Sequence, residues 1–80
     1  MQIMTLDELI NRKIRDYGFA TYAECAEGLG ISIRLLETIV NGRTTCPLLD
    51  TRRTLCAAFD IAQPVLDRAI KNSMARRRFA

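Results

Sequence analysis

Side chains that can form hydrogen bonds lie on one side of a predicted helix at residues 33–40. Leu36, Ile39 and Val40 fall at the three- and four-residue spacing of a buried stripe. The stripe leaves an opposite, exposed face, which carries Ile33, Arg34, Glu37 and Thr38. Arginine can donate two hydrogen bonds to the edge of guanine, threonine can bond a base or a phosphate, glutamate can accept from cytosine, and isoleucine can pack on the methyl group of thymine. This face therefore has the chemistry needed to contact base pairs.

A simpler interpretation of the same face is also open. Arg34 and Glu37 are three residues apart, a spacing at which two opposite charges form a solvated pair that stabilises a helix by about 0.2–0.5 kcal/mol. Against this, Ile33 and Leu35 make the helix more apolar than a solvent face requires, and exposed apolar groups mark contact surfaces.

The segment before this helix predicts a second, shorter helix and a tight turn that joins the two. Thr21 and Glu24 have the spacing of a capping box that starts a short helix ending near residue 28, and Ala26 is small enough for another helix to approach closely. Gly30 can adopt the left-handed backbone of a tight turn, and Ser32 can cap the next helix. The Asn41-Gly42 pair can end that helix, because both residues tolerate a left-handed cap.

Three further helices are predicted, and no strands. A capping box at residues 5–8 starts the first, which runs to Gly18 with an apolar stripe at Leu6, Leu9, Ile10, Ile14 and Tyr17. The fourth, from residue 48 to about 59, has Pro47 before it and expected core residues Leu48, Leu49, Leu55, Cys56, Phe59 and Ile61. The fifth follows Gln63-Pro64 and carries apolar Val65, Leu66, Ala69 and Ile70. The expected organisation is one all-α domain over residues 1–72 and a basic tail over 73–80.

The order and spacing of several residues resemble the lambda-repressor-like, or Cro-type, helix-turn-helix domains. The matching elements are Cys25-Ala26, Leu29-Gly30-Ile31-Ser32, Leu36, Ile39-Val40-Asn41-Gly42 and Pro47. The resemblance covers about residues 6–70. It departs from the family pattern where Val40 replaces the glutamate before Asn-Gly and where Tyr22 replaces the glutamine that often begins the second helix.

The resemblance implies a five-helix bundle with a helix-turn-helix that binds double-stranded DNA. By position in the family, the base-contacting residues are Ser32, Ile33, Arg34, Glu37 and Thr38. The residues placed to contact phosphates on either side of the groove are Thr21, Tyr22, Asn41, Arg43 and Thr44. The implied function is a sequence-specific transcriptional regulator, a repressor of phage, plasmid or antitoxin type that acts as a homodimer. The apolar residues of the fifth helix are the expected dimer surface.

Composition limits the other possibilities. The net charge of +3 is uneven: residues 1–61 have seven basic and eight acidic residues, whereas residues 62–80 have five basic and one acidic. Arg76, Arg77 and Arg78 can therefore either follow a phosphate backbone or form a solvated tail. The chain lacks histidine, a glycine-rich phosphate loop and a nucleophile beside a base, so we expect neither an enzyme nor a metal or cofactor site. We also expect a cytoplasmic protein without a membrane segment, since the sequence has no signal peptide and no long apolar run.

Three cysteines without a CxxC pair argue against a disulfide framework. Cys25 and Cys56 are expected in the core, and Cys46, before Pro47 in a loop, is either an inert residue or a redox-sensing thiol.

A function of another class is also open: the same fold can bind a protein, such as a toxin or a polymerase subunit. Ile33, Leu35 and the apolar fifth helix would then supply the contact surface. The weak charge of residues 1–61 favours this alternative, whereas Arg34, Thr38 and Arg43 favour DNA.

Overall fold

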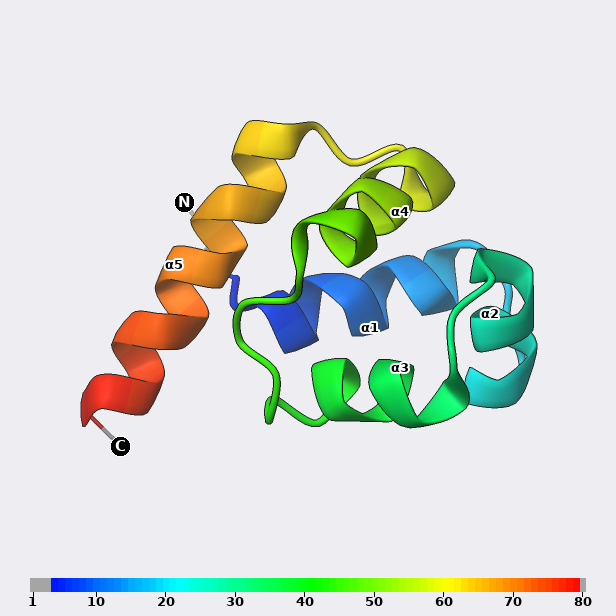
Figure 1. Ribbon diagram of the computed structural model, residues 1–80, viewed down its shortest axis with the longest axis horizontal. Coiled ribbons are helices and arrows are strands. Elements are labelled where there is room, and N and C mark those ends of the chain that lie inside the picture. The colour runs from blue at the N-terminus through cyan, green and yellow to red at the C-terminus, as the bar shows by residue number, and fades with distance from the viewer. Residues whose placement is uncertain (1–3, 80) are drawn as a thin grey trace.

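The computed structural model describes residues 4–79, which form five helices and no strand (Figure 1). The helices are α1 (Leu6–Asp16), α2 (Tyr22–Leu29), α3 (Ile33–Val40), α4 (Leu49–Phe59) and α5 (Gln63–Phe79). Their Cα atoms have a radius of gyration of 11.7 Å. The expected all-α class with five helices is confirmed over these residues.

Local sequence signals set where the first three helices begin and end. The capping box at α1 is formed, with the backbone amide of Thr5 donating to Oε1 of Glu8 at 3.0 Å. Thr21 caps α2 by accepting from the Glu24 amide at 3.1 Å, but the reciprocal bond of a full capping box is not formed between these two described residues. Gly30 ends α2 with φ +75°, the left-handed conformation that the turn requires.

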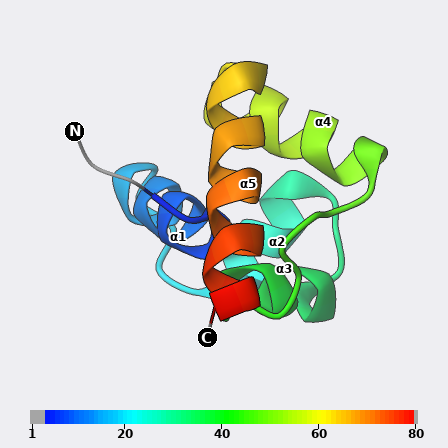
Figure 2. The same cartoon turned by 90° about the vertical axis from the view of Figure 1, so that its left-hand side faces the viewer.

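One apolar core joins all five helices. α1 packs against α3 and α5, and α4 packs against α2 and α5. α1 runs between α4 and α3 in the view of Figure 1, and Figure 2 shows α3 and α4 on the same side of α1. The side chains that are wholly or almost wholly excluded from solvent are Leu6, Ile10, Cys25, Leu36, Ile39, Leu55, Phe59 and Leu66. Burial of this apolar set holds α3 against α1, so one side of α3 is fixed in the core.

Two tyrosine side chains are about half exposed. The Tyr17 side chain, expected in the α1 stripe, is 48% exposed because α1 ends at Asp16. Its ring still meets the ring of Phe59 edge to face, with centroids 5.3 Å apart. Tyr22, the first residue of α2, is 41% exposed.

The predicted burial at the start of α4 is wrong. Leu48 is 81% exposed and Leu49 is 45% exposed. Leu48 precedes the helix, and its extended backbone (φ −61°, ψ 157°) removes it from the helical period that buries Leu55 and Phe59. Pro47 lies two residues before the helix and is buried.

α5 continues through Ser73 to Phe79, within the stretch expected as a basic tail. Ser73 is buried, and its Oγ accepts a 2.6 Å hydrogen bond from the Leu6 amide. The Asn72 side chain donates to the Met4 carbonyl at 2.9 Å. Contacts with residues far away in the sequence therefore fix this part of α5. The side chains of Arg77 and Arg78 lie outside the described part of the structure.

The cysteines occupy three environments. Cys25 is fully buried, as expected, Cys56 is half-buried between the core and solvent, and Cys46 is exposed. Burial raises the pKa of the Cys25 thiol, so less of the reactive thiolate is present there at neutral pH.

Candidate nucleic-acid interface

α3 turns its apolar side inward and its polar side outward. Leu36 and Ile39 have no exposed surface, whereas Ile33 is 44% exposed. Arg34 and Glu37 are exposed on the same helix. Because the buried side chains fix the rotation of α3, its outer face has a defined orientation relative to the other helices. Of the five candidate base-contacting residues, Ser32, Ile33, Arg34 and Glu37 lie at the surface.

Thr38, the fifth candidate, is tied to the loop that follows α3. Its side chain is half-buried and donates to the Leu35 carbonyl at 2.7 Å. The Thr38 hydroxyl also accepts a 2.9 Å hydrogen bond from the hydroxyl of Thr44. The backbone of the two residues is joined as well, because the Thr44 amide donates to the Thr38 carbonyl at 2.9 Å. The structure thus brings a candidate base contact and a candidate phosphate contact together. With its proton committed, the Thr38 hydroxyl is better suited to accept than to donate.

Ser32 has a comparable internal role. Its hydroxyl accepts from the Leu35 amide at 3.0 Å and so caps α3. The hydroxyl proton does not take part in this bond, and the residue is exposed. Ser32 can therefore cap the helix and still donate to a ligand at its N-terminus.

Asn11 of α1 joins the start of α2 to the end of α3. Its side-chain amide donates to the Val40 carbonyl at 3.0 Å and to the Asp7 carbonyl at 2.8 Å. Its Oδ1 accepts from the Tyr22 hydroxyl at 2.8 Å. One side chain therefore fixes a candidate phosphate contact, Tyr22, beside the last turn of α3.

Sequence reasoning did not identify Asn11. Its only local hint was a polar residue of low helix propensity in the middle of α1. Its partners in α2 and α3 are 11 and 29 residues away along the chain.

The loop after α3 contains a tight turn that is closed by a local hydrogen bond. The Asn41 side chain accepts from the Arg43 amide at 3.0 Å, and Gly42 has φ +84°. Asn41 itself is not left-handed, with φ −96°, so the left-handed residue of the expected Asn-Gly cap is the glycine. Arg43 is exposed, whereas Thr44 is half-buried against α3. The turn thus directs a guanidinium group from the end of α3 toward the surface.

A pocket of about 340 Å³ lies where this loop meets α1 and α5. Its lining includes Arg43 from the loop, Asp7 from α1 and Arg76 from α5. Two guanidinium groups and one carboxylate therefore share one hollow. Ser73 and Arg76 of α5 line this pocket together with the loop, so Arg76 adds a positive charge to the side on which Arg43 lies.

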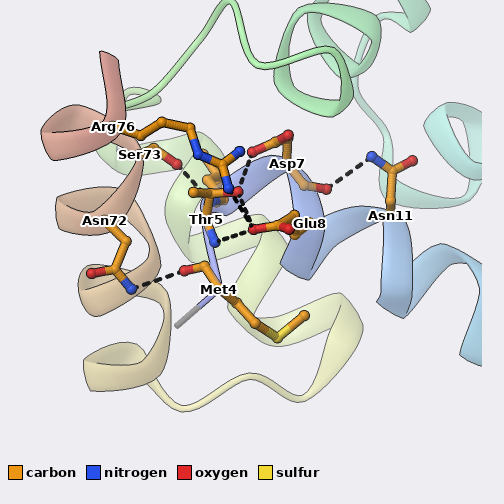
Figure 3. A network of polar contacts seen from close by, with 9 residues as sticks. Met4, Thr5, Asp7, Glu8, Asn11, Asn72, Ser73 and Arg76 are labelled. Carbon is orange, nitrogen blue, oxygen red and sulfur yellow. Dashed lines mark hydrogen bonds and ion pairs between the residues drawn. The ribbon is translucent and has the colours of Figure 1, made fainter. Parts of the chain in front are cut away.

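The Arg76 guanidinium contacts a network of hydrogen bonds at the start of α1 (Figure 3). It contacts Oε1 of Glu8 at 3.3 Å, and the same oxygen accepts from the Thr5 amide and, at 2.7 Å, from the Thr5 hydroxyl. The hydrogen bonds from the amide and hydroxyl of Thr5, followed by the charge of Arg76, lower the pKa of the Glu8 carboxyl.

Two classes of feature are absent from the described part of the chain. Within residues 4–79, no three His, Cys, Asp or Glu residues gather in a way that could hold a metal ion. Across the same residues, no helix has both the length and the apolar character needed to cross a bilayer.

Known proteins offer no direct comparison. The chain matches no protein-family model, and neither a curated protein nor a solved structure matches it. Any function must therefore be argued from its own residues and geometry.

Proposed function

We propose that the protein is a sequence-specific DNA-binding transcriptional regulator with a lambda-repressor-like helix-turn-helix formed by α2 and α3. The observation that carries the proposal is the two-sided character of α3. Leu36 and Ile39 are fully buried, while Arg34, Glu37 and Ile33 face outward. A helix held by one face, with an arginine at its exposed start, can enter a major groove and bond base edges.

The groups around α3 support this proposal. Thr21 and Tyr22 lie at the start of α2, and Arg43 lies beyond the end of α3. Asn11 connects Tyr22 to the Val40 carbonyl, so possible phosphate contacts flank α3 from two elements. Contacts to phosphates position a protein on DNA, and contacts to base edges provide the specificity.

Repression by a homodimer in the cytoplasm completes the proposal. A regulator of about this size can act by occupying a promoter, and two copies can read successive major grooves about 34 Å apart. The dimer surface expected on α5 needs correction, because Leu66, Ala69 and Ile70 are buried in the monomer core and only Val65 of that set is exposed.

Selection of bound duplexes from a random pool tests the proposal directly. On the selected site, Arg34→Ala should lose about 1–3 kcal/mol and relax the preference at one base pair, whereas Arg43→Ala should weaken all duplexes alike and reduce the salt slope by about one. Arg68→Ala is a matched control. Arg68 is exposed and lies six residues into α5, whose N-terminal half is away from α3 in Figure 1.

Three outcomes distinguish the hypotheses. Different behaviour of the Arg34 and Arg43 variants, with an unchanged control, supports base reading by α3. Equal losses on every duplex would mean that Arg34 reads no base. If neither variant changes binding, α3 does not enter DNA.

Exposed apolar side chains favour a second candidate, a module that binds another protein. Leu48 is 81% exposed, and Leu49 and Ile33 are each more than 40% exposed. Such residues are suited to a partner surface. Failure of the protein to bind heparin and random duplex at low salt would replace the DNA proposal with this one.

A further inference from the structure

The hydroxyl groups of Thr38 and Thr44 form a chain of hydrogen bonds whose direction is fixed at one end. The Thr38 hydroxyl bonds to the Leu35 carbonyl at 2.7 Å, and the Thr44 and Thr38 hydroxyls bond to each other at 2.9 Å. A carbonyl oxygen can only accept, so Thr38 is the donor in the first bond. Because its single proton is then used, Thr44 is the donor in the second. Both hydroxyl protons therefore point inward, from the loop toward the backbone of α3.

This direction determines what the Thr38 side chain can offer to a ligand. A threonine hydroxyl has one proton and two lone pairs. Thr38 uses its proton on the Leu35 carbonyl and one lone pair on the Thr44 hydroxyl, so one lone pair remains. The side chain is half-buried and keeps part of its surface exposed. A polar group that bonds to this hydroxyl must therefore be a donor.

Thr38 lies one helical turn after Arg34 on α3. The Cβ atoms of helix residues four apart are about 5–6 Å from each other, and successive base pairs of DNA are about 3.4 Å apart. If α3 enters a major groove, contacts from these two side chains fall within about two base pairs of each other.

The bases differ in the donors that they present in the major groove. Adenine presents its N6 amino group and cytosine its N4 amino group, whereas the oxygens of guanine and thymine in this groove only accept. A side chain that can only accept therefore distinguishes adenine and cytosine from guanine and thymine.

We propose that Thr38 reads the exocyclic amino group of adenine or cytosine in the major groove, an inference that rests on the proposed DNA-binding function. The remaining lone pair of Thr38 accepts from the amino group. Thr44 is the positioning residue, because its proton holds the Thr38 hydroxyl in the accepting orientation. That proton is then not available to a phosphate oxygen, which needs a donor.

Removal of single amino groups from the DNA tests this contact. In the duplex selected from a random pool, each adenine near the base pair read by Arg34 is replaced by purine, and each cytosine by 2-pyrimidinone, which lack the amino group. One of these replacements should weaken binding of the original protein about three- to tenfold, as expected for one lost hydrogen bond. The identity of the sensitive base distinguishes adenine from cytosine.

Thr38→Val keeps the shape of the side chain and removes the acceptor. The sensitivity to the amino group should disappear in this variant, whereas Thr38→Ser, which keeps the hydroxyl, should retain it. Thr54→Val is the matched control, because the Thr54 hydroxyl also donates to a helix carbonyl, that of Asp50 at 3.0 Å, but on α4. Comparison of the variants on the same duplexes cancels any effect of the modified bases on the duplex itself.

Thr44→Val tests the positioning role. Without the Thr44 proton, the Thr38 hydroxyl is free to turn and donate. The preference for amino over carbonyl groups at the sensitive base pair should therefore narrow, while affinity for the selected duplex changes by less than about threefold. Circular dichroism at the temperature of the binding experiments checks that each variant is folded.

The outcomes separate this inference from the proposal on which it rests. Failure to select any duplex would overturn both. A selected duplex that tolerates every amino deletion near the base pair read by Arg34, or an unchanged sensitivity in Thr38→Val, would overturn the role of Thr38 and leave DNA binding intact. Lower stability of Thr38→Val and Thr44→Val without any change in base preference would mean that the two hydroxyls only hold the loop on α3.

Discussion

The hydroxyl group of Tyr22 donates a 2.8 Å hydrogen bond to Oδ1 of Asn11, and the amide of the same asparagine donates to the Val40 carbonyl at 3.0 Å. Three helices therefore meet at one side chain. The Val40 carbonyl belongs to the last turn of α3, where no later amide of the helix can donate a hydrogen bond to it. Asn11 thus completes the end of α3 and fixes Tyr22 at the same time.

Asn11→Ala should destabilise the protein by about 1–3 kcal/mol, because it removes the partners of both Tyr22 and the Val40 carbonyl. Tyr22→Phe is the matched control and should cost less, about 0.5–1.5 kcal/mol, since it removes one hydrogen bond of an exposed side chain. Urea unfolding followed by circular dichroism measures both. A larger loss for Tyr22→Phe than for Asn11→Ala would show that Asn11 does not connect the helices.

The features that sequence predicted well are set by neighbouring residues. The capping box of Thr5 and Glu8 and the serine cap of α3 each involve residues three positions apart, and both are formed. The stripe of Leu36 and Ile39 also follows from helical spacing alone, and both residues are buried.

The features that sequence missed depend on distant parts of the chain. Ser73 is held by an amide 67 residues away, so nothing near it in the sequence indicates that α5 continues. Leu48 illustrates the opposite error, because its apolar character suggested burial while the backbone before α4 directs it to solvent. For the candidate interface, the surface position of Arg34 was predictable, but the bond between Thr38 and Thr44 was not.

Leu36→Ala should destabilise the protein by about 2–5 kcal/mol, because the fully buried side chain leaves a cavity between α3 and the rest of the core. In a domain of 80 residues, this is a large part of the total free energy of unfolding. Ile33→Ala, at a position 44% exposed on the same helix, should cost much less. Denaturant melts that give equal losses for the two variants would contradict the assigned rotation of α3.

Ser73→Ala should cost about 1–3 kcal/mol, because it leaves the buried Leu6 amide without its acceptor. Met74→Ala at the neighbouring, half-exposed position should stay within about 0.5 kcal/mol of the original protein. Thermal unfolding of the two variants under one set of conditions provides the comparison. Similar melting temperatures would indicate that the C-terminal part of α5 does not stabilise the start of α1.

The carboxyl group of Glu8 should make stability depend on pH under acidic conditions. Its pKa in the folded protein is lowered from the ordinary value of 4.5, first by the amide and hydroxyl of Thr5 and then by the charge of Arg76. The unfolded chain therefore binds a proton more readily than the folded protein does. The stabilisation by Glu8 is fully present above about pH 4.5 and is lost as the pH falls through the lower, folded pKa.

Glu8→Gln should accordingly be less stable than the original protein at pH 7, and the difference should disappear as the pH falls below 4.5. Glutamine can still accept from the Thr5 amide, so the comparison isolates the charge rather than the capping geometry. Arg76→Gln should reproduce a smaller part of the same loss, because the Arg76 charge contributes less to the lowered pKa than the two bonds from Thr5 do. Urea unfolding between pH 3 and pH 7 measures these differences. A constant difference between Glu8→Gln and the original protein across this range would show that the ionised carboxylate is not what stabilises the start of α1.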